Sequence, residues 1–348
     1  MISSIHFENF GVLPTLDFQN PSRINLIIGE NGTGKTFFLK VLYAAVKTME
    51  DFHRGDNIRT VTDILSERLR WTFQVDRLGD LVSRASHDNL SFAMELDSQQ
   101  FGYTFTHSAA SKVGTAVSPK SGREANSVFI PAKEVLSLYQ VILKSRDVDQ
   151  SFEFDDTYYD LAKALRISPK KGKNNAAFSK SRKSLQNIIN GRVDFDERTG
   201  RWFYRDKSNF KFAIGATSEG IRKISIIDRL LLNGYLDSRS IIFIDDAESG
   251  LHPDAVCQLL DVVDGLADRT DLQFFIASHS YFVLKKLALI AMRKADFVTC
   301  VSLHKDRSME FHDLHDGMPN NSIVDASIQL YEQEIAESLQ WQEPADPI

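Results

Sequence analysis

The sequence predicts an α/β fold with a mixed sheet whose core strands are parallel, and three observations point to it. An apolar run at residues 24 to 28 leads into a glycine-rich loop and then a helical pattern. A second run, residues 241 to 244, ends in two adjacent acids, and a third, residues 272 to 280, ends in Ser-His-Ser. Unbroken apolar runs are typical of parallel strands covered on both faces. We expect an antiparallel first lobe and a helical insertion around this core.

The bulk composition limits the class of protein. The chain has 348 residues, 43% of them hydrophobic, a net charge of -6 and a pI near 5.9. This balance argues against a protein that coats nucleic acid or anionic membrane with its whole surface. The two cysteines, Cys257 and Cys300, lack metal or redox spacing. The N-terminus lacks a signal-peptide pattern, and Lys285 and Lys286 split the most apolar later segment. We therefore expect a cytoplasmic protein that does not enter a membrane.

The glycine-rich loop carries the strongest motif. INLIIGENGTGKT, residues 24 to 36, contains G-x-x-x-x-G-K-T between a predicted strand and a predicted helix, the context that a phosphate-binding loop requires. Lys35 would reach the β- and γ-phosphates, and the Thr36 hydroxyl would bind Mg²⁺. A plain glycine turn is the alternative. The nucleotide-binding candidates are Glu30, Asn31, Gly32, Thr33, Gly34, Lys35 and Thr36. We expect the chain to bind a nucleoside triphosphate, with ATP and Mg²⁺ as cofactors.

The acids after the second run fit a metal site. A phosphate-binding loop needs an acid for its metal at the end of a neighbouring strand, and Asp245 occupies that position. Asp246 could orient and deprotonate the attacking water, or it could be a turn acid. His279 follows at a helix-sized distance, which suggests a neighbouring strand and a contact with the γ-phosphate.

Residues 216 to 236, ATSEGIRKISIIDRLLLNGYL, predict a helix. Ser218 is a candidate N-cap, Gly220 allows close approach of a phosphate, and Asn233-Gly234 ends the pattern. On its own, this segment is also consistent with an ordinary capped amphipathic helix.

Together, these motifs resemble the ABC-type ATPase superfamily on its SMC- and RecF-like side. GENGTGKT resembles the Walker A motif, and IIFIDDAESGLHP resembles Walker B followed by the D-loop. ATSEGIRK resembles the signature segment, and ASHS resembles the segment that carries the switch histidine. The chain looks closest to stand-alone AAA-family ATPases related to OLD-type proteins, many of which belong to bacterial anti-phage defence systems. ENFG, FIPAKEVLSL and DLHDGMPNN also fit that group.

The resemblance implies head-to-tail dimers or higher oligomers with composite ATP sites. Each ATP would lie between Walker A of one subunit and Ser218 with Gly220 of the other, and His279 and Asp246 would act on the γ-phosphate. No glutamine stands at the Q-loop position, where Lys133 and Glu134 are the candidates for metal sensing.

The acidic strand departs from the family pattern. The family usually has D-E-P, whereas this chain has Asp245-Asp246-Ala247. The shorter side chain withdraws the carboxylate by about 1.5 Å, and an error near 1 Å can cost about a hundredfold in rate. Either the backbone compensates, Glu248 contributes to catalysis, or the enzyme is slow.

Residues 141–211 are expected to form an insertion or lid between two parts of the ATPase head, residues 1–140 and 212–348. Its first part has six acids and no base (147–160), and the next has eight Lys or Arg and no acid (161–190). A solvated loop and a nucleic-acid or partner contact both fit this pattern. The residues that would contact DNA or RNA lie within 163–192 and include Lys170, Lys171, Arg182 and Lys183.

Other segments narrow the function. LVSRAS, LSFAMELD and FGYTFTHS, between residues 81 and 108, are expected to be strands or strand-like runs of the first lobe. No heptad pattern predicts a coiled coil. The segment after His279 lacks acids with metal spacing, so we expect no nuclease there. The preferred interpretation is a dimeric ATPase that gates or scaffolds a separately encoded effector in phage defence. The alternatives are a RecF-like DNA clamp and a scaffold that binds ATP without hydrolysing it.

Overall fold

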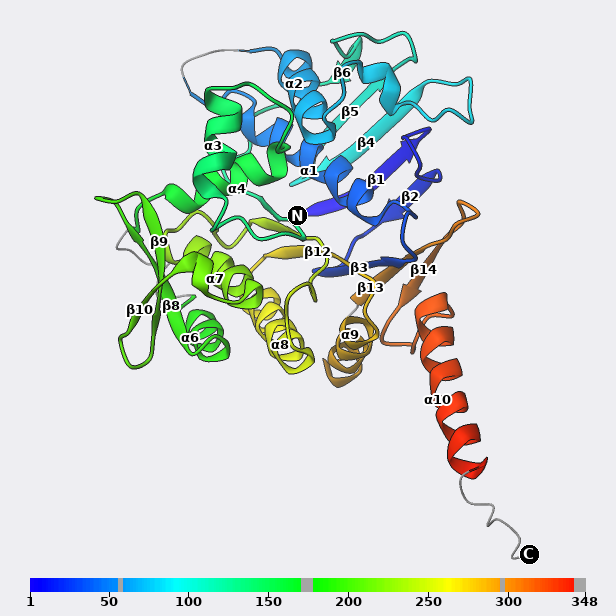
Figure 1. The fold of residues 1–348 in the computed structure, drawn as a ribbon. Coiled ribbons are helices and arrows are strands. Elements are labelled where there is room, and N and C mark those ends of the chain that lie inside the picture. Colours follow the sequence, from blue (N-terminus) through cyan, green and yellow to red (C-terminus); the bar gives the residue numbers. More distant parts are fainter. Residues whose placement is uncertain (56–58, 170–177, 295–297, 341–348) are drawn as a thin grey trace, which may run out of the picture.

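The structure, a computed structural model, describes residues 1–55, 59–169, 178–294 and 298–340. Its central sheet has six strands (Figure 1). In spatial order they are β14 (Met309–Asp313), β13 (Val298–Leu303), β3 (Ile24–Gly29), β12 (Gln273–Ser278), β11 (Ile241–Ile244) and β7 (Val128–Ile130). All pairs are parallel except β13 with β14. The expected parallel core is confirmed, and β12 lies between β3 and β11.

The central sheet separates two hydrophobic layers. Along β11, Ile241 and Phe243 face one layer, whereas Ile242 and Ile244 face the other, because successive strand residues point to opposite faces. The first layer contains α1 (Lys35–Asp51), and the second contains α7 (Glu219–Leu232), α8 (Pro253–Arg269) and α9 (Tyr281–Lys294). Burial on both sides explains why these strands are apolar throughout.

An antiparallel sheet forms the first lobe, as expected. Its order is β2 (Leu16–Gln19), β1 (Ile2–Glu8), β4 (Leu90–Leu96), β5 (Gln99–Phe105) and β6 (Thr115–Val117). The helix α2 (Val61–Phe73) packs beside α1 in the same hydrophobic layer. The prediction of a strand at residues 81–86 was wrong. A 3-10 turn, η1 (Leu78–Leu81), occupies its start, and only Val82 pairs, in an isolated bridge with Phe10. The apolar run there is only two residues long, too short for a strand.

The insertion is helical at first and then forms a sheet. The expected helices are α3 (Tyr139–Asp147), α4 (Asp156–Arg166) and α6 (Ser179–Ile188). They are followed by an antiparallel sheet, β8 (Gly191–Asp196), β9 (Arg201–Asp206) and β10 (Lys211–Ala213), which the sequence interpretation missed. Trp202 on β9 is buried and packs against Tyr139 and Phe195. These aromatic residues join the same hydrophobic layer as α7 and α8.

The last helix, α10 (Ser322–Gln340), leads away from the body of the molecule (Figure 1). Its first turn packs against the core through Ile323 and Val324. Within the described ranges, every helix is too short or too polar to cross a bilayer.

Candidate nucleotide site

The loop Gly29–Thr36 joins the end of β3 to the start of α1. Gly29 has φ 151°, and a Cβ there would lie 2.3 Å from the Leu303 carbonyl oxygen, so only glycine fits. Gly34, with φ 100°, begins α1, and no side chain caps that helix end. The first backbone N–H groups of α1, with the positive end of the helix dipole, therefore suit an anion at this position.

Lys35 is folded back onto the loop. Its Nζ donates hydrogen bonds to the carbonyl oxygens of Gly29 (2.7 Å) and Glu30 (2.9 Å). Burial lowers the pKa of Lys35, while the nearby acids Asp246, Asp245 and Glu248 oppose that shift. The lysine thus lies between the loop and the acids that follow β11.

The remaining residues of the loop differ in how exposed they are to solvent. Asn31 and Gly32 are exposed at the tip, and the buried Thr33 donates its hydroxyl to the Glu30 carbonyl oxygen (3.0 Å). The Glu30 carboxylate pairs with Lys305. An incoming phosphate would therefore meet an exposed loop tip whose base is held by hydrogen bonds.

Thr36 and Asp245 come together as the sequence predicted. The Thr36 hydroxyl is 2.9 and 3.0 Å from the two carboxylate oxygens of Asp245. Burial raises the pKa of Asp245 to about 6, and the charge of Asp246 adds to the effect. A hydroxyl and a buried carboxylate are oxygen ligands of the kind that Mg²⁺ prefers, and a cation would restore the ionised form of Asp245. These two residues fit the expected metal.

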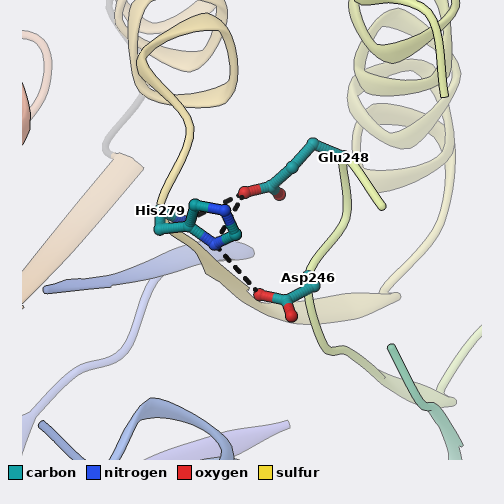
Figure 2. A group of neighbouring side chains, drawn as sticks. All are labelled: Asp246, Glu248 and His279. Atoms are coloured by element: carbon teal, nitrogen blue, oxygen red, sulfur yellow. Dashed lines mark hydrogen bonds and ion pairs between the residues drawn. The ribbon is translucent and has the colours of Figure 1, made fainter. Parts of the chain in front are cut away.

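Asp246, Glu248 and His279 form a cluster at the ends of β11 and β12 (Figure 2). The Nδ1 atom of His279 lies 3.4 Å from both Asp246 Oδ1 and Glu248 Oε1. The Ser278 hydroxyl lies 2.9 Å from each Glu248 oxygen, and the backbone N–H of His279 donates to Glu248 Oε1 (3.0 Å). Glu248 is thus fixed by β12, whereas the His279 side chain is 54% exposed. Asp246 sits in a turn with φ 45°.

Lys223 on α7 was missed as a site residue. It is 1% exposed, and its Nζ donates to the backbone carbonyl oxygens of Asp245 (3.2 Å) and Asp246. Burial lowers its pKa to about 8. One signal was available, because Lys223 falls on the apolar face of the helix, between Gly220 and Ile227. A charged residue at such a position is buried only when it has partners.

The two residues expected at the Q-loop position differ in environment. Glu134 is buried, its Oε1 lies 3.1 Å from Arg222 Nε on α7, and it accepts a hydrogen bond from the Ser137 backbone N–H (3.1 Å). Lys133 is exposed. Glu134 therefore ties this segment to the start of α7.

The start of α7, with Gly220, lies against Gly250 in the turn after β11. Ser218 caps α7 by accepting a hydrogen bond from the Ile221 backbone N–H (3.3 Å), as predicted. A Cβ on Gly220 would lie 2.6 Å from the Gly250 carbonyl oxygen. In the described part of the chain, no hydrogen bond joins Ser218 or Gly220 to the loop 29–36.

The acidic half of the insertion contacts the head. Asp155 at the start of α4 accepts a hydrogen bond from Lys40 Nζ on α1 (2.6 Å). Arg68 on α2 donates to Asp156 (3.0 Å) and Asp160 (2.7 Å). These three acids are therefore structural partners of bases in the head, whereas the other three, Asp147, Asp149 and Glu153, are exposed.

The basic half is only partly described. Arg182 Nε donates to Asp228 on α7 (2.8 Å), whereas Lys183 is exposed. Lys170 and Lys171 lie outside the described residues. Among the residues predicted to contact nucleic acid, Arg182 is therefore engaged in an ion pair that stabilises the fold.

Comparisons with known proteins agree with this geometry. A family model described as "AAA domain, putative AbiEii toxin, Type IV TA system" matches residues 45–285. The "DNA replication and repair protein RecF" of Bacillus cereus (strain G9842) is 30% identical over 101 residues, which are 29% of this chain and 24% of the relative. The same protein of Bacillus thuringiensis (strain Al Hakam) matches to the same extent. Each match thus spans about a quarter of the relative's length.

Two solved structures share the fold. An Smc head bound to the C-winged helix domain of ScpA has a TM-score of 0.54 and 11% identity, and covers 90% of this chain and 97% of that one. A Pyrococcus furiosus Smc head with an extended coiled coil, bound to the C-terminal domain of ScpA, has a TM-score of 0.51 and 12% identity, and covers 95% and 98%. With the loop, the two acids and the histidine at the ends of β3, β11 and β12, the chain belongs to this AAA-domain family, and it shares the fold of these Smc heads.

Proposed function

We propose that the chain binds ATP with Mg²⁺, hydrolyses it in a dimer, and uses this cycle to gate or scaffold a separately encoded effector. The observation that carries the proposal is the contact of Thr36 with Asp245 beside the cluster of Asp246, Glu248 and His279. One pair suits a metal and the other three suit water activation, and Lys35 lies close to the acids of both.

Thr36 and Asp245 would hold Mg²⁺, which, when bound, neutralises charge on the β- and γ-phosphates. Lys35 would exchange its two carbonyl partners for phosphate oxygens, a gain because hydrogen bonds between charged groups are stronger than those to neutral carbonyls. The exposed ring of His279 would then contact the γ-phosphate.

Water activation is assigned to Asp246 and Glu248 together. Asp246 is one methylene shorter than the usual glutamate, but from its left-handed turn its carboxylate still reaches His279. Glu248 contacts the same Nδ1 atom of His279 and is already oriented by Ser278. The approach of both acids to one ring nitrogen supports a shared role, in which one carboxylate takes the proton of the water and the other orients the ring.

Single-turnover release of γ-phosphate tests this assignment. We expect slow release by the wild type and a loss of about 10² to 10³-fold in Asp246→Asn and in Glu248→Gln. Asp246→Glu separates two cases, since a faster variant identifies Asp246 as a brake. The exposed Glu310→Gln is the matched control. Tight ATP binding without any release in the wild type or Asp246→Glu would instead indicate an ATP-held scaffold.

The effector role and phage defence rest on the resemblance to OLD-type proteins, and the words "toxin" and "TA system" in the family description support a multi-component system. A RecF-like DNA clamp is the second candidate, favoured by the matches to RecF. Salt-sensitive DNA binding that needs ATP and is lost in Lys180→Ala with Lys183→Ala would favour the clamp. Both lysines are exposed on α6, so their loss should spare the fold.

A further inference from the structure

The helix α10 carries an apolar stripe that continues beyond its contact with the body. Val324, Ile328, Tyr331 and Ile335 follow one another at spacings of four, three and four residues, which places them on one side of a helix. Val324 packs against the core, whereas the next three are 51%, 63% and 43% exposed. The stripe therefore begins as an internal contact and runs on without cover in the described chain (Figure 1).

Acidic residues border this stripe. The sequence of α10, SIVDASIQLYEQEIAESLQ, has four acids and neither lysine nor arginine. Asp325 and Glu332 each follow a stripe residue directly, and Glu334 directly precedes one, so they flank the seam as e and g residues flank a coiled-coil seam. Glu337 lies off the seam. A matching surface should be apolar and basic.

The outer face of α9 has that chemistry. Phe282, Leu289 and Met292 are 52%, 45% and 62% exposed, and the exposed Lys285 lies among them at helical spacing. The helix YFVLKKLALIAMRK contains no acid.

Acids of the neighbouring α8 engage the other bases of α9. The ion pairs are Lys286 with Asp261 (2.7 Å), Arg293 with Asp261 (3.3 Å), and Lys294 with Asp264 (2.8 Å) and Asp268. These three bases and three acids balance in charge, so the net positive charge on this face is that of the exposed Lys285.

We propose that α10 of one copy docks on the outer face of α9 of a second copy. Within one chain, α10 starts beside α9 and leads away from the body, so its exposed part lies off its own α9 (Figure 1). Two α10 helices paired with each other would oppose acid to acid, which is unfavourable. A two-fold arrangement lets both copies exchange α10 reciprocally, which doubles the contact.

The contact is centred on the end of α9 that lies away from the composite ATP site. Phe282 is only three residues after His279, whereas Met292 lies eleven residues beyond the start of α9 at Tyr281, about 16 Å at 1.5 Å per residue. The interaction therefore needs no nucleotide. It would hold two chains together between rounds of ATP binding, and it stands whether or not the proposed hydrolysis occurs.

Sedimentation velocity of the nucleotide-free full chain tests the proposal. We expect a dimer, also in a Lys35→Ala background where phosphate contacts are lost. Ile328→Asp and Leu289→Asp should each weaken it at least about thirtyfold, the loss typical of a central apolar anchor. Gln329→Asp, next to Ile328 but off the stripe, is the matched control and should leave the dimer intact.

Charge exchange adds a second arm. Glu334→Lys and Lys285→Glu should each weaken the dimer, and their combination in one chain should restore it, whereas Glu337→Lys should have no effect. A nucleotide-free chain that is monomeric up to about 100 μM would overturn the proposal, as would a dimer indifferent to Ile328→Asp. Mixing Leu289→Cys copies with Tyr331→Cys copies gives a disulfide between chains only if the contact joins different copies.

Discussion

Asp245 lies at the end of β11 and is only 5% exposed. This burial raises the pKa of its carboxyl group to about 6, from the ordinary value of 3.8. The unfolded chain loses this proton near pH 4, and the folded chain loses it only near pH 6. The folded chain therefore holds the extra proton between these values, and the free energy of unfolding falls as pH rises from about 4 to about 6.

Asp245→Asn should remove that decline. We expect the variant to be more stable than the wild type at pH 7, by up to about 3 kcal/mol, and equally stable at pH 4. Urea unfolding at a series of pH values, without nucleotide, measures this difference, with Glu310→Gln as the control. Parallel pH profiles for variant and wild type would show that Asp245 is ionised at its ordinary pKa. The same variant should lose the tightening of ATP binding by Mg²⁺.

The residues that the sequence revealed are those whose roles depend on short local spacing. Thr36 and Asp245 were assigned because a loop motif and a strand end each identify one residue, and the structure brings the pair into contact. Lys223 escaped because its partners lie more than twenty residues away, on the turn after β11. The environment of Glu248 likewise depends on Ser278 of another strand. Contacts between segments that are distant in the sequence have no characteristic spacing, so the sequence alone did not predict them.

Among the elements, α7 is the one that joins the signature segment to the acidic turn. Lys223→Met keeps the length of the side chain and avoids a buried unpaired charge, but it releases the carbonyl oxygens of Asp245 and Asp246. We expect kcat for ATP hydrolysis to fall about ten- to a hundredfold, because small errors in position are costly. ATP affinity should change little, since Lys35 and its loop are untouched.

Steady-state kinetics with a direct nucleotide-binding assay separates these two effects. Lys223→Arg, which keeps the charge and the donors, should recover part of the rate. Equal losses in affinity and rate would mean that Lys223 supports the whole site and not the orientation of the turn. Unchanged circular dichroism would establish that both variants fold.

The strands that could be predicted are those whose burial gives a clear apolar pattern in the sequence. The strands β3, β11 and β12 are covered on both faces, so their apolar runs were plain. The sheet of β8 to β10 was missed because its strands are half exposed, and acids and bases interrupt the alternation of Val193, Phe195, Trp202 and Tyr204. Charged residues on the open face of such a short strand resemble a loop.

For the whole molecule, the position of Ser218 raises the question whether one ATP site is formed by one chain or by two. Ser218 caps α7 beside the D-loop of its own chain, with no hydrogen bond to its own phosphate loop in the described residues. If the site is shared, Lys35→Ala and Ser218→Arg each inactivate the enzyme but damage opposite halves of a site. A mixed dimer then contains one site with both defects and one intact site.

Mixing the two inactive proteins in equal amounts should therefore restore ATP hydrolysis to about a quarter of the wild-type rate, because half of the dimers are mixed and half of their sites are whole. Each variant alone, measured at the same total concentration, supplies the baseline. A mixture that stays at this baseline, while sedimentation shows mixed dimers, would contradict head-to-tail sharing of sites that act independently. Recovery above a quarter would mean that mixed dimers form preferentially, as expected if nucleotide bound at the one intact site holds the two chains together.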